Sequence, residues 1–297
     1  MTFTTHTIEA NGQSLHVKMA GPEGAPVILM LHGFPEYWAS WSQVAKLFID
    51  THRVVLPDQR GFNLSSKPTE IDAYNTKHLV ADMAALIEQV SPNRKVILCG
   101  HDWGASVAYA LAMRHADNIS HLIIANGVHP ICFQKALMAG GAQTDASQYI
   151  NYFCQPDVEH SLAEDKFRRL LNMFQKFSSA PWLTDEIKAT YRTAWQGPET
   201  VAAMLNWYRA SPLQVPKSGE SGQELAITDA MREKYKISMP HLLLWGLQDV
   251  ALLPEAREDL GEFAGDLTMK ENDTAGHWIL HEEPKWVATQ INEFLIP

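Results

Sequence analysis

The segment GHDWGAS, Gly100–Ser106, has the clearest chemical meaning in the chain. It follows the apolar run KVILC and opens a stretch of helical periodicity, which predicts a tight turn between a strand and a helix. Glycines two places before and after Asp102 leave the room that such a turn needs. An Asp there could serve only as a helix cap, but a cap does not require glycine on both sides. We expect Asp102 to be a nucleophile.

An aspartate nucleophile suits displacement at saturated carbon, because its carboxylate is ionised at neutral pH without a helping base and a helix N-terminus favours the charge. Its product is an ester that water must cleave, with the help of a base and an oxyanion hole. Asp249 follows the apolar run LLLWG, and His277 lies later in AGHW. The order nucleophile, acid, histidine predicts a triad in which Asp249 orients His277 and His277 activates water.

The segment HGFPE, His32–Glu36, follows another apolar run, PVILML. A loop at this place supplies one backbone N–H to the oxyanion hole, and the residue after the nucleophile supplies the other. We therefore expect Phe34 and Trp103 to be the two donors. Pro35 is a candidate for a cis peptide bond.

These residues need a sheet to position them. The Asn11-Gly12 pair predicts a hairpin, and the later apolar runs are continuous, as in parallel strands buried on both faces. Helical periodicity at Thr76–Gln89 and Gly104–His115 indicates an α/β sheet with helical crossovers. The expected strands are His6–Ala10, Ser14–Met19, Pro26–Leu31, Arg53–Leu56, Lys95–Cys99, Ile119–Ala125, His241–Trp245 and Leu267–Lys270.

The pattern changes between about His129 and Tyr235, where aromatic residues are frequent and Glu164–Phe177 and Thr184–Ala194 read as helices. We interpret residues 129–235 as a helical cap, and residues 1–128 and 236–297 as the two parts of the core. The Pro- and Gly-containing segment Ser211–Gln223 is expected to be a loop that returns the chain to the core.

Composition excludes several classes of function. The 297-residue chain has a formal net charge of −10 and no long run of Lys or Arg, so nucleic acid and anionic membranes are poor partners. No apolar run is long enough to span a membrane. The N-terminus lacks a signal-peptide pattern, and the three cysteines form no zinc or disulfide pattern. A cytoplasmic location is expected.

The motifs HGFPEYW, DQRGFNLSSKP (Asp58–Pro68), GHDWGAS, WGLQD and GHW together resemble the epoxide hydrolases of the α/β-hydrolase fold superfamily. The resemblance covers nearly the whole chain, and the motifs come in the family order. It implies a mostly parallel sheet flanked by helices, with a helical lid. It also implies hydrolysis of an epoxide to a vicinal diol through an ester on Asp102. Asn63 and Ala105 depart from the family pattern, since glycine is usual at both places, but asparagine tolerates a left-handed backbone.

The resemblance further implies two catalytic tyrosines in the lid. The segments YINYFCQP and LNWYR place them at Tyr149 and Tyr208, with Tyr152 as the weaker candidate for the first. Opening an epoxide creates an alkoxide, and two phenol hydroxyls can polarise the ring oxygen and then protonate it. Packing is the alternative role for such aromatic residues.

Related dehalogenases share the Asp–His–Asp machinery and remain an alternative. Haloalkane dehalogenases tend to carry Asn where this chain has Phe34, and fluoroacetate dehalogenases carry Arg where it has Trp103. Both departures favour the epoxide interpretation, although the Trp103 indole could form half of a halide site. A non-catalytic binding protein of the same fold is the more distant alternative.

The expected ligands are a small apolar epoxide and water, with no metal or organic cofactor. The sequence leaves the epoxide, its regiochemistry and the oligomeric state open, including a homodimer. The residues expected to line the substrate pocket, besides Trp103, are Trp38, Phe153, Trp207 and Trp278.

Overall fold

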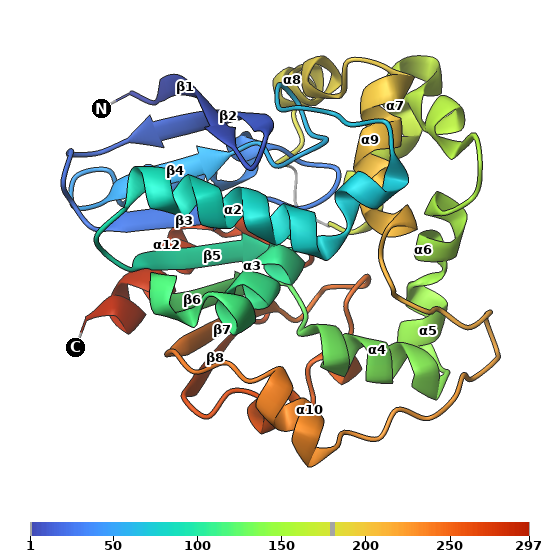
Figure 1. Cartoon of the computed structure of the whole chain (residues 1–297). Helices are drawn as coiled ribbons and strands as arrows, with labels where there is room; N and C mark the ends of the chain where they lie inside the picture. Colours follow the sequence, from blue (N-terminus) through green and yellow to red (C-terminus); the bar gives the residue numbers. More distant parts are fainter. Residues whose placement is uncertain (1, 179–181, 297) are drawn as a thin grey trace.

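The computed structural model describes residues 2–178 and 182–296, and an eight-stranded sheet forms its centre (Figure 1). The strand order is β1-β2-β4-β3-β5-β6-β7-β8. β2 pairs antiparallel with both β1 and β4, and all the other neighbouring strands of this sheet pair in parallel. The strands are β1 Thr4–Ala10, β2 Gln13–Ala20, β3 Val27–Leu31, β4 Arg53–Pro57, β5 Val96–His101, β6 Ile119–Ala125, β7 His241–Gly246 and β8 Leu267–Asn272. The predicted mostly parallel α/β sheet is confirmed.

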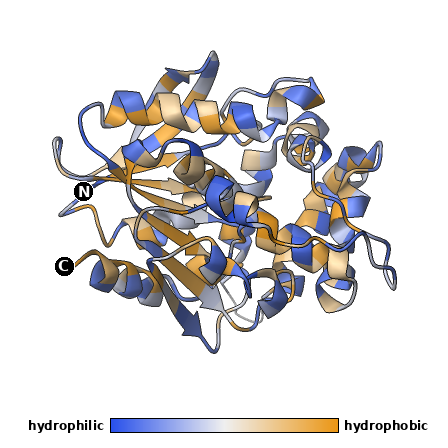
Figure 2. Cartoon of the chain, turned by 60° about the horizontal axis from the view of Figure 1, so that its bottom comes forward, coloured by the Kyte–Doolittle hydropathy of each residue, from blue (hydrophilic) through white to orange (hydrophobic). Residues whose placement is uncertain are grey.

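Both faces of the sheet are covered, which explains the continuous apolar runs. All five residues of β3 are buried. Val27, Leu29 and Leu31 belong to the core layer shared with α2 (Thr76–Val90) and α3 (Trp103–Arg114). Ile28 and Met30 face the other layer, with α1 (Ser42–Ala45) and α12 (Pro284–Leu295). Figure 2 shows this arrangement as hydrophobic strands between helices with hydrophilic outer sides.

The first two strands form the predicted hairpin. Asn11 and Gly12 both have positive φ, 50° and 73°, as a two-residue turn of this kind requires. Asn63, the other asparagine noted in the sequence, also adopts a left-handed backbone, with φ 42°. Its amide donates to Asp58 Oδ2 over 2.8 Å, which holds the turn without glycine.

Helices fill the chain between β6 and β7 and gather at one end of the sheet (Figure 1). They fall within residues 129–235, the range interpreted as a cap. Their bounds are α4 Pro130–Ala139, α5 Ala142–Ala146, α6 Gln148–Phe153, α7 Val158–Lys176, α8 Asp185–Trp195, α9 Pro198–Arg209 and α10 Asp229–Lys234. The remaining short elements are η1 Trp38–Trp41, η2 Ile71–Tyr74, η3 Ala116–Asn118, η4 Pro254–Ala256, η5 Leu260–Glu262 and α11 Ile279–Glu282. Within the described ranges, no helix combines the length and apolar character needed to cross a membrane.

The helix expected at Glu164–Phe177 differs in the structure. It begins earlier, at Val158, and its helical backbone breaks over residues 164–167. Two contacts from α8 stabilise this break. The Lys166 carbonyl accepts from Arg192 Nε over 3.2 Å, and the Phe167 ring packs on Trp195 at 5.4 Å.

Three side chains of the inserted helices are hydrogen-bonded to loops of the core. Trp207 Nε1 donates to the Arg60 carbonyl over 2.9 Å, and Trp195 Nε1 donates to the Pro35 carbonyl over 2.6 Å. Tyr191 donates to Glu36 over 2.9 Å. The insertion is therefore attached to the loops that follow β3 and β4.

A buried ion pair joins the second of these loops to α2. Arg60 donates from Nε and an η nitrogen to the two oxygens of Asp82, over 2.8 and 2.7 Å, and Asn11 adds a hydrogen bond of 2.9 Å. Burial raises the pKa of Asp82, and these partners oppose that shift. The Asp82 carboxylate is thus bonded to Arg60 and Asn11, and Arg60 also donates to the Ala73 carbonyl over 2.6 Å.

We predict that Asp82→Asn lowers the free energy of unfolding by roughly 3–5 kcal/mol, because it leaves the Arg60 charge buried without its partner. Denaturant unfolding followed by circular dichroism measures the change. Asp229→Asn is the matched control, since Asp229 pairs with Arg232 at the surface over 2.7 Å, and it should leave unfolding nearly unchanged. Equal effects of the two substitutions would contradict the prediction.

Candidate active site

Asp102 stands at the turn between β5 and α3, as predicted. Its backbone lies at φ 49° and ψ −121°, a strained conformation for a residue with a side chain. The turn requires a close approach to β3, because a Cβ on Gly104 would lie 2.2 Å from the Leu31 carbonyl oxygen. Ala105 fits its place because Gly127 faces it without a side chain.

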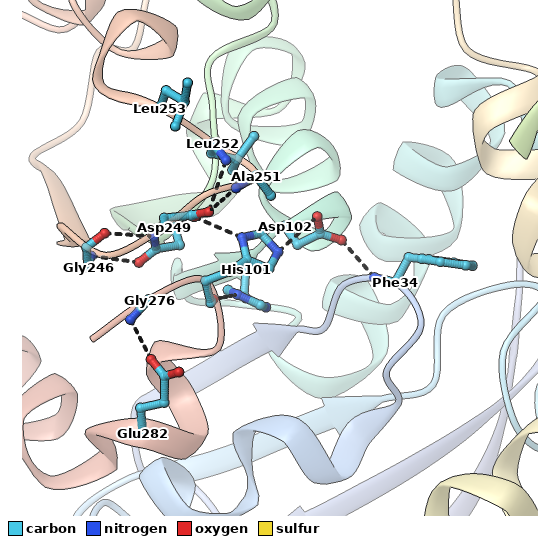
Figure 3. Close-up of polar contacts among 12 residues, drawn as sticks. Phe34, His101, Asp102, Gly246, Asp249, Ala251, Leu252, Leu253, Gly276 and Glu282 are labelled. Atoms are coloured by element: carbon cyan, nitrogen blue, oxygen red, sulfur yellow. Dashed lines mark hydrogen bonds and ion pairs between the residues drawn. The ribbon is translucent and has the colours of Figure 1, made fainter. Parts of the chain in front are cut away.

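The Asp102 carboxylate accepts a hydrogen bond on one side and faces a charged ring on the other. Phe34 N–H donates to Oδ1 over 2.7 Å, and His277 Nε2 lies 3.5 Å from Oδ2 (Figure 3). A Cβ on Gly33 would lie 2.4 Å from Oδ1, so glycine lets the loop approach this closely. The Phe34-Pro35 bond is cis. Trp103 follows Asp102 directly. Within the part of the chain that the structure describes, the Asp102 carboxylate contacts the Phe34 N–H and the His277 ring, and the backbone N–H of Trp103 does not donate to it.

Asp249 holds the other side of His277. Its Oδ2 lies 2.8 Å from His277 Nδ1 and also accepts from Asn126 over 2.7 Å. Its Oδ1 accepts from the backbone N–H groups of Ala251 and Leu252 over 2.8 and 2.9 Å (Figure 3). Burial alone would raise the pKa of Asp249, but the His277 charge and these hydrogen bonds lower it below the usual value.

His277 lies between two carboxylates and is 3% exposed. Burial disfavours a charged ring, yet Asp249 and Asp102 together raise its pKa to about 10. At neutral pH the ring is therefore an imidazolium ion held between two anions.

The sequence analysis missed three residues that support this arrangement. Asn126 follows β6 and holds both Asp249 and the Gly246 N–H. His101 Nε2 lies 2.8 Å from the His277 carbonyl oxygen, and its Nδ1 lies 3.2 Å from the buried carboxylate of Glu36. Both His101 and Glu36 stand inside motifs that the sequence analysis singled out, so their position beside Asp102 and Phe34 was an available signal. Asn126 carried no such signal.

Tyr149 and Tyr208 meet across the space beside Asp102. They come from α6 and α9, and their rings pack edge to face with centroids 6.2 Å apart. Burial, followed by the nearby Asp102 charge, raises the pKa of each phenol. Both hydroxyls therefore stay protonated and available as donors. Tyr152 lies elsewhere, with its hydroxyl beside Ser161 and Arg169.

A cavity of about 590 Å³ contains this group of side chains. Asp102, Trp103, Tyr149 and Tyr208 line it, together with apolar residues from several elements. The four other residues predicted to line the pocket do not. Trp38 contacts Phe3 and Tyr37, Phe153 packs beneath Phe34 and the two tyrosines, Trp207 packs on Phe62 and Trp103, and Trp278 packs on Phe174 and His277. Phe153, Trp207 and Trp278 are buried and Trp38 is partly buried. The wall of the cavity itself combines aliphatic, aromatic and polar side chains.

One group of side chains has the spacing of metal ligands within the described residues: Asp157, Glu159 and His160. It lies away from the Asp102 cavity, and Glu159 is engaged by Arg209 over 2.6 Å. We assign it no role in the site.

The family model described as the alpha/beta hydrolase fold matches residues 26–284. The AB hydrolase superfamily protein YfhM of Bacillus subtilis is 35% identical, over 97% of this chain and 96% of that protein. Epoxide hydrolase 2 of Caenorhabditis elegans is 31% identical, over 95% of this chain and 77% of that protein.

Solved structures give the same result. A structure from work on novel epoxide hydrolases in metagenomes from hot environments superposes with a TM-score of 0.88, at 33% identity over 99% of both chains. The epoxide hydrolase of Bacillus megaterium, solved with an inhibitor, gives 0.86 at 28% identity, over 98% of this chain and 100% of that one. The chain belongs to the α/β-hydrolase fold family, and within it to the group that contains the epoxide hydrolases.

We predict that the His277 imidazolium keeps its proton up to about pH 10, far above the ordinary value of 6.5. Because folding raises this pKa, the charged ring stabilises the fold fully below about pH 6.5, and that contribution is lost as pH rises through about 10. Side-chain NMR measures the titration. Asp102→Asn should lower the pKa of His277 by removing one carboxylate charge.

His121 provides an internal control, because burial lowers its pKa below 6.5. As pH rises, His121 should lose its proton before His277, both in the unmodified protein and in Asp102→Asn. Deprotonation of His277 near pH 6.5 in the unmodified protein would show that the two carboxylates do not hold a charged ring.

Proposed function

We propose that this protein is an epoxide hydrolase in which Asp102 is the nucleophile, Asp249 and His277 complete the triad, and Tyr149 and Tyr208 bind the epoxide oxygen. The observation that supports this most is the meeting of Asp102 with the two lid tyrosines in one cavity. A carboxylate nucleophile needs an electrophilic carbon with a leaving oxygen, and two buried phenols are suited to receive that oxygen.

In the first step, an Asp102 oxygen attacks an epoxide ring carbon. A carbon–oxygen bond to Asp102 forms as the ring carbon–oxygen bond breaks, and the electron pair stays on the leaving oxygen. A tyrosine hydroxyl donates a proton to that oxygen, while the second tyrosine holds it by a hydrogen bond. The raised pKa of each phenol suits this role, because the donor is fully protonated before the reaction.

Formation of the ester changes the charge around His277. Asp102 is then neutral, so one of the two anions that raise the pKa of His277 is gone. The imidazolium can release its proton, which restores the tyrosine, and the neutral ring becomes a base. The arrangement therefore switches His277 into its active form only after the nucleophile has reacted.

In the second step, His277 takes a proton from water, and the resulting hydroxide attacks the Asp102 carboxyl carbon. The Phe34 N–H lies where it can stabilise the oxyanion, and Trp103 N–H is the proposed second donor. Collapse expels the diol oxygen, which takes the remaining carboxyl proton and leaves Asp102 ionised and His277 charged. The two steps add water across the epoxide and balance without a metal or organic cofactor.

The proposal covers a cap formed by residues 129–235 over core segments 1–128 and 236–297. It also includes a cytoplasmic location, with a homodimer as the oligomeric state to test. Cell fractionation and light scattering of the purified protein would address these last two points.

The proposed function is tested by a single turnover in oxygen-18 water with styrene oxide and, separately, a short haloalkane. We predict diol from styrene oxide, with heavy oxygen appearing first in the Asp102 carboxylate. His277→Gln should form the ester but not hydrolyse it, so the intact protein should gain the mass of one substrate molecule.

Halide and alcohol from the haloalkane, with epoxides untouched, would instead identify a dehalogenase. Absence of both reactions across a varied panel would favour a binding protein. Heavy oxygen that enters diol directly, without passing through Asp102, would overturn the proposed nucleophile.

We also predict that Tyr149→Phe and Tyr208→Phe each lower the rate of ester formation from epoxide, by roughly 10²–10⁴-fold where the tyrosine is the proton donor. Stopped-flow tryptophan fluorescence measures this step. Tyr152→Phe is the matched control and should leave the rate unchanged. Equal rates in all three variants would assign Tyr149 and Tyr208 to packing alone.

A further inference from the structure

A buried glutamine of the helical insertion is bonded to the loop that carries Asp249. Gln143 lies on α5 and is 2% exposed. Its Nε2 donates to the Ala251 carbonyl over 3.0 Å, and its Oε1 accepts from the Leu253 N–H over 2.7 Å. These partners are 108 and 110 residues away in the sequence. One side chain of the insertion therefore holds two successive peptide groups of a core loop.

The orientation of the Gln143 amide is defined by all of its partners. The second hydrogen of Nε2 is used by Ser147 Oγ, which lies 2.8 Å away inside the insertion. Exchange of the amide oxygen and nitrogen would place two oxygens against each other at Ala251 and two N–H groups against each other at Leu253. The amide thus fits this loop in one orientation only.

The peptide group between Ala251 and Leu252 connects Gln143 to the triad. Its carbonyl accepts from Gln143, and its N–H donates to Asp249 Oδ1 over 2.9 Å (Figure 3 shows the loop). A peptide group is planar, so a contact that fixes the direction of the carbonyl also fixes the direction of the N–H. Hydrogen bonds in such a chain also polarise and strengthen one another. Gln143 therefore both orients and strengthens a donor to Asp249.

Asp249 passes this constraint on to His277. The Asp249 carboxylate is a rigid plane, with Oδ1 bonded to the loop and Oδ2 lying 2.8 Å from His277 Nδ1. A rotation that weakens the contacts of Oδ1 also moves Oδ2 relative to the imidazole ring. The orientation of His277 therefore depends on the conformation of residues 249–253.

The backbone that carries Gln143 is itself attached to the core. Thr144, the next residue of α5, donates from its hydroxyl to the Leu137 carbonyl of α4 over 2.8 Å. Lys135 of α4 pairs with Asp259 of the core over 2.8 Å. Gln143 thus extends from a fixed support, which a residue that positions a loop requires.

We propose that Gln143 is a positioning residue for the triad, which orients Asp249 through the peptide between Ala251 and Leu252 and thereby orients His277 for ester hydrolysis. Ester formation is carried out by Asp102 and the two tyrosines, so the contribution of Gln143 falls on the second step. The assignment to that step rests on the proposed function, whereas the effect on His277 can be measured without a substrate.

The kinetic test uses Gln143→Met, which keeps the approximate length of the side chain and removes its hydrogen bonds. We expect hydrolysis of the Asp102 ester to slow by roughly 10-fold to 100-fold, because a misplacement of about 1 Å in a reacting group has effects of this size. With styrene oxide, kcat should fall while kcat/KM stays nearly unchanged, since kcat/KM depends on the steps up to ester formation. The mass of the intact protein should show the ester accumulating during turnover.

Ser147→Ala is the matched control. It removes the partner of the same amide inside the insertion and leaves the bonds to Ala251 and Leu253 in place, so both steps should keep their rates. Gln143→Asn retains an amide but is one methylene shorter and cannot reach both backbone groups, so it should slow ester hydrolysis as well. This variant decides the question if circular dichroism shows that Gln143→Met does not fold.

Titration of His277 by side-chain NMR, without substrate, separates this inference from the reaction. Burial lowers the pKa of His277, and Asp249 is the main group that raises it, to about 10. Gln143→Met and Gln143→Asn should lower this pKa, and Ser147→Ala should leave it unchanged. Asp102 and His101, which also face the His277 ring, are the same in all of these proteins.

A lower pKa of His277 in the Gln143 variants would support the positioning role even if no epoxide were hydrolysed. An unchanged pKa, with both steps slowed equally, would show that Gln143 stabilises the insertion alone. Unchanged ester hydrolysis in folded Gln143→Met, or an equal defect in Ser147→Ala, would overturn the proposal even if styrene oxide were converted to diol.

Discussion

A buried positive ring between a buried carboxylate and a partly buried one is the interaction on which the rest of this structure depends. His277 is nearly excluded from water, so its charge is stable only because Asp249 and Asp102 lie on either side. Neither anion can be moved freely. Asp249 is held by two backbone N–H groups and by Asn126, and Asp102 is held by a strained turn and by Phe34. The loops that follow β3, β5, β6 and β7 thus all contribute, directly or through Asp102 and Asp249, to stabilising the charge on His277.

The helical insertion is part of the same assembly, because it is bonded to the loops that shape the site. Trp195 donates to the carbonyl of Pro35, the residue after Phe34. Tyr191 donates to Glu36, whose other oxygen faces His101, and His101 contacts the His277 carbonyl oxygen. Lifting these helices would disturb the loop that carries Phe34.

Much of the fold could be predicted from the sequence because its signals are local. Buried runs such as PVILML predict a strand whatever surrounds them, and the glycines beside Asp102 define a turn within seven residues. Asn126 could not be assigned in this way, because its role depends on Asp249, a partner more than a hundred residues away. The wall of the cavity was predicted only in part. Trp103 lines the cavity as expected, but Phe153, Trp207 and Trp278 are buried against other rings, because large rings contribute much apolar area to the core.

The fit between Ala105 and Gly127 couples the turn after β5 to the turn after β6. A Cβ on residue 127 would lie 2.2 Å from the Ala105 methyl and 2.9 Å from a methyl group of Ile124, so position 127 has no room for a side chain. Ala105 lies on the first turn of the helix that Asp102 caps, and any movement that relieved the clash would shift Asp102. The two turns therefore cannot vary independently, and a substitution at one of them has to be interpreted together with the residues of the other.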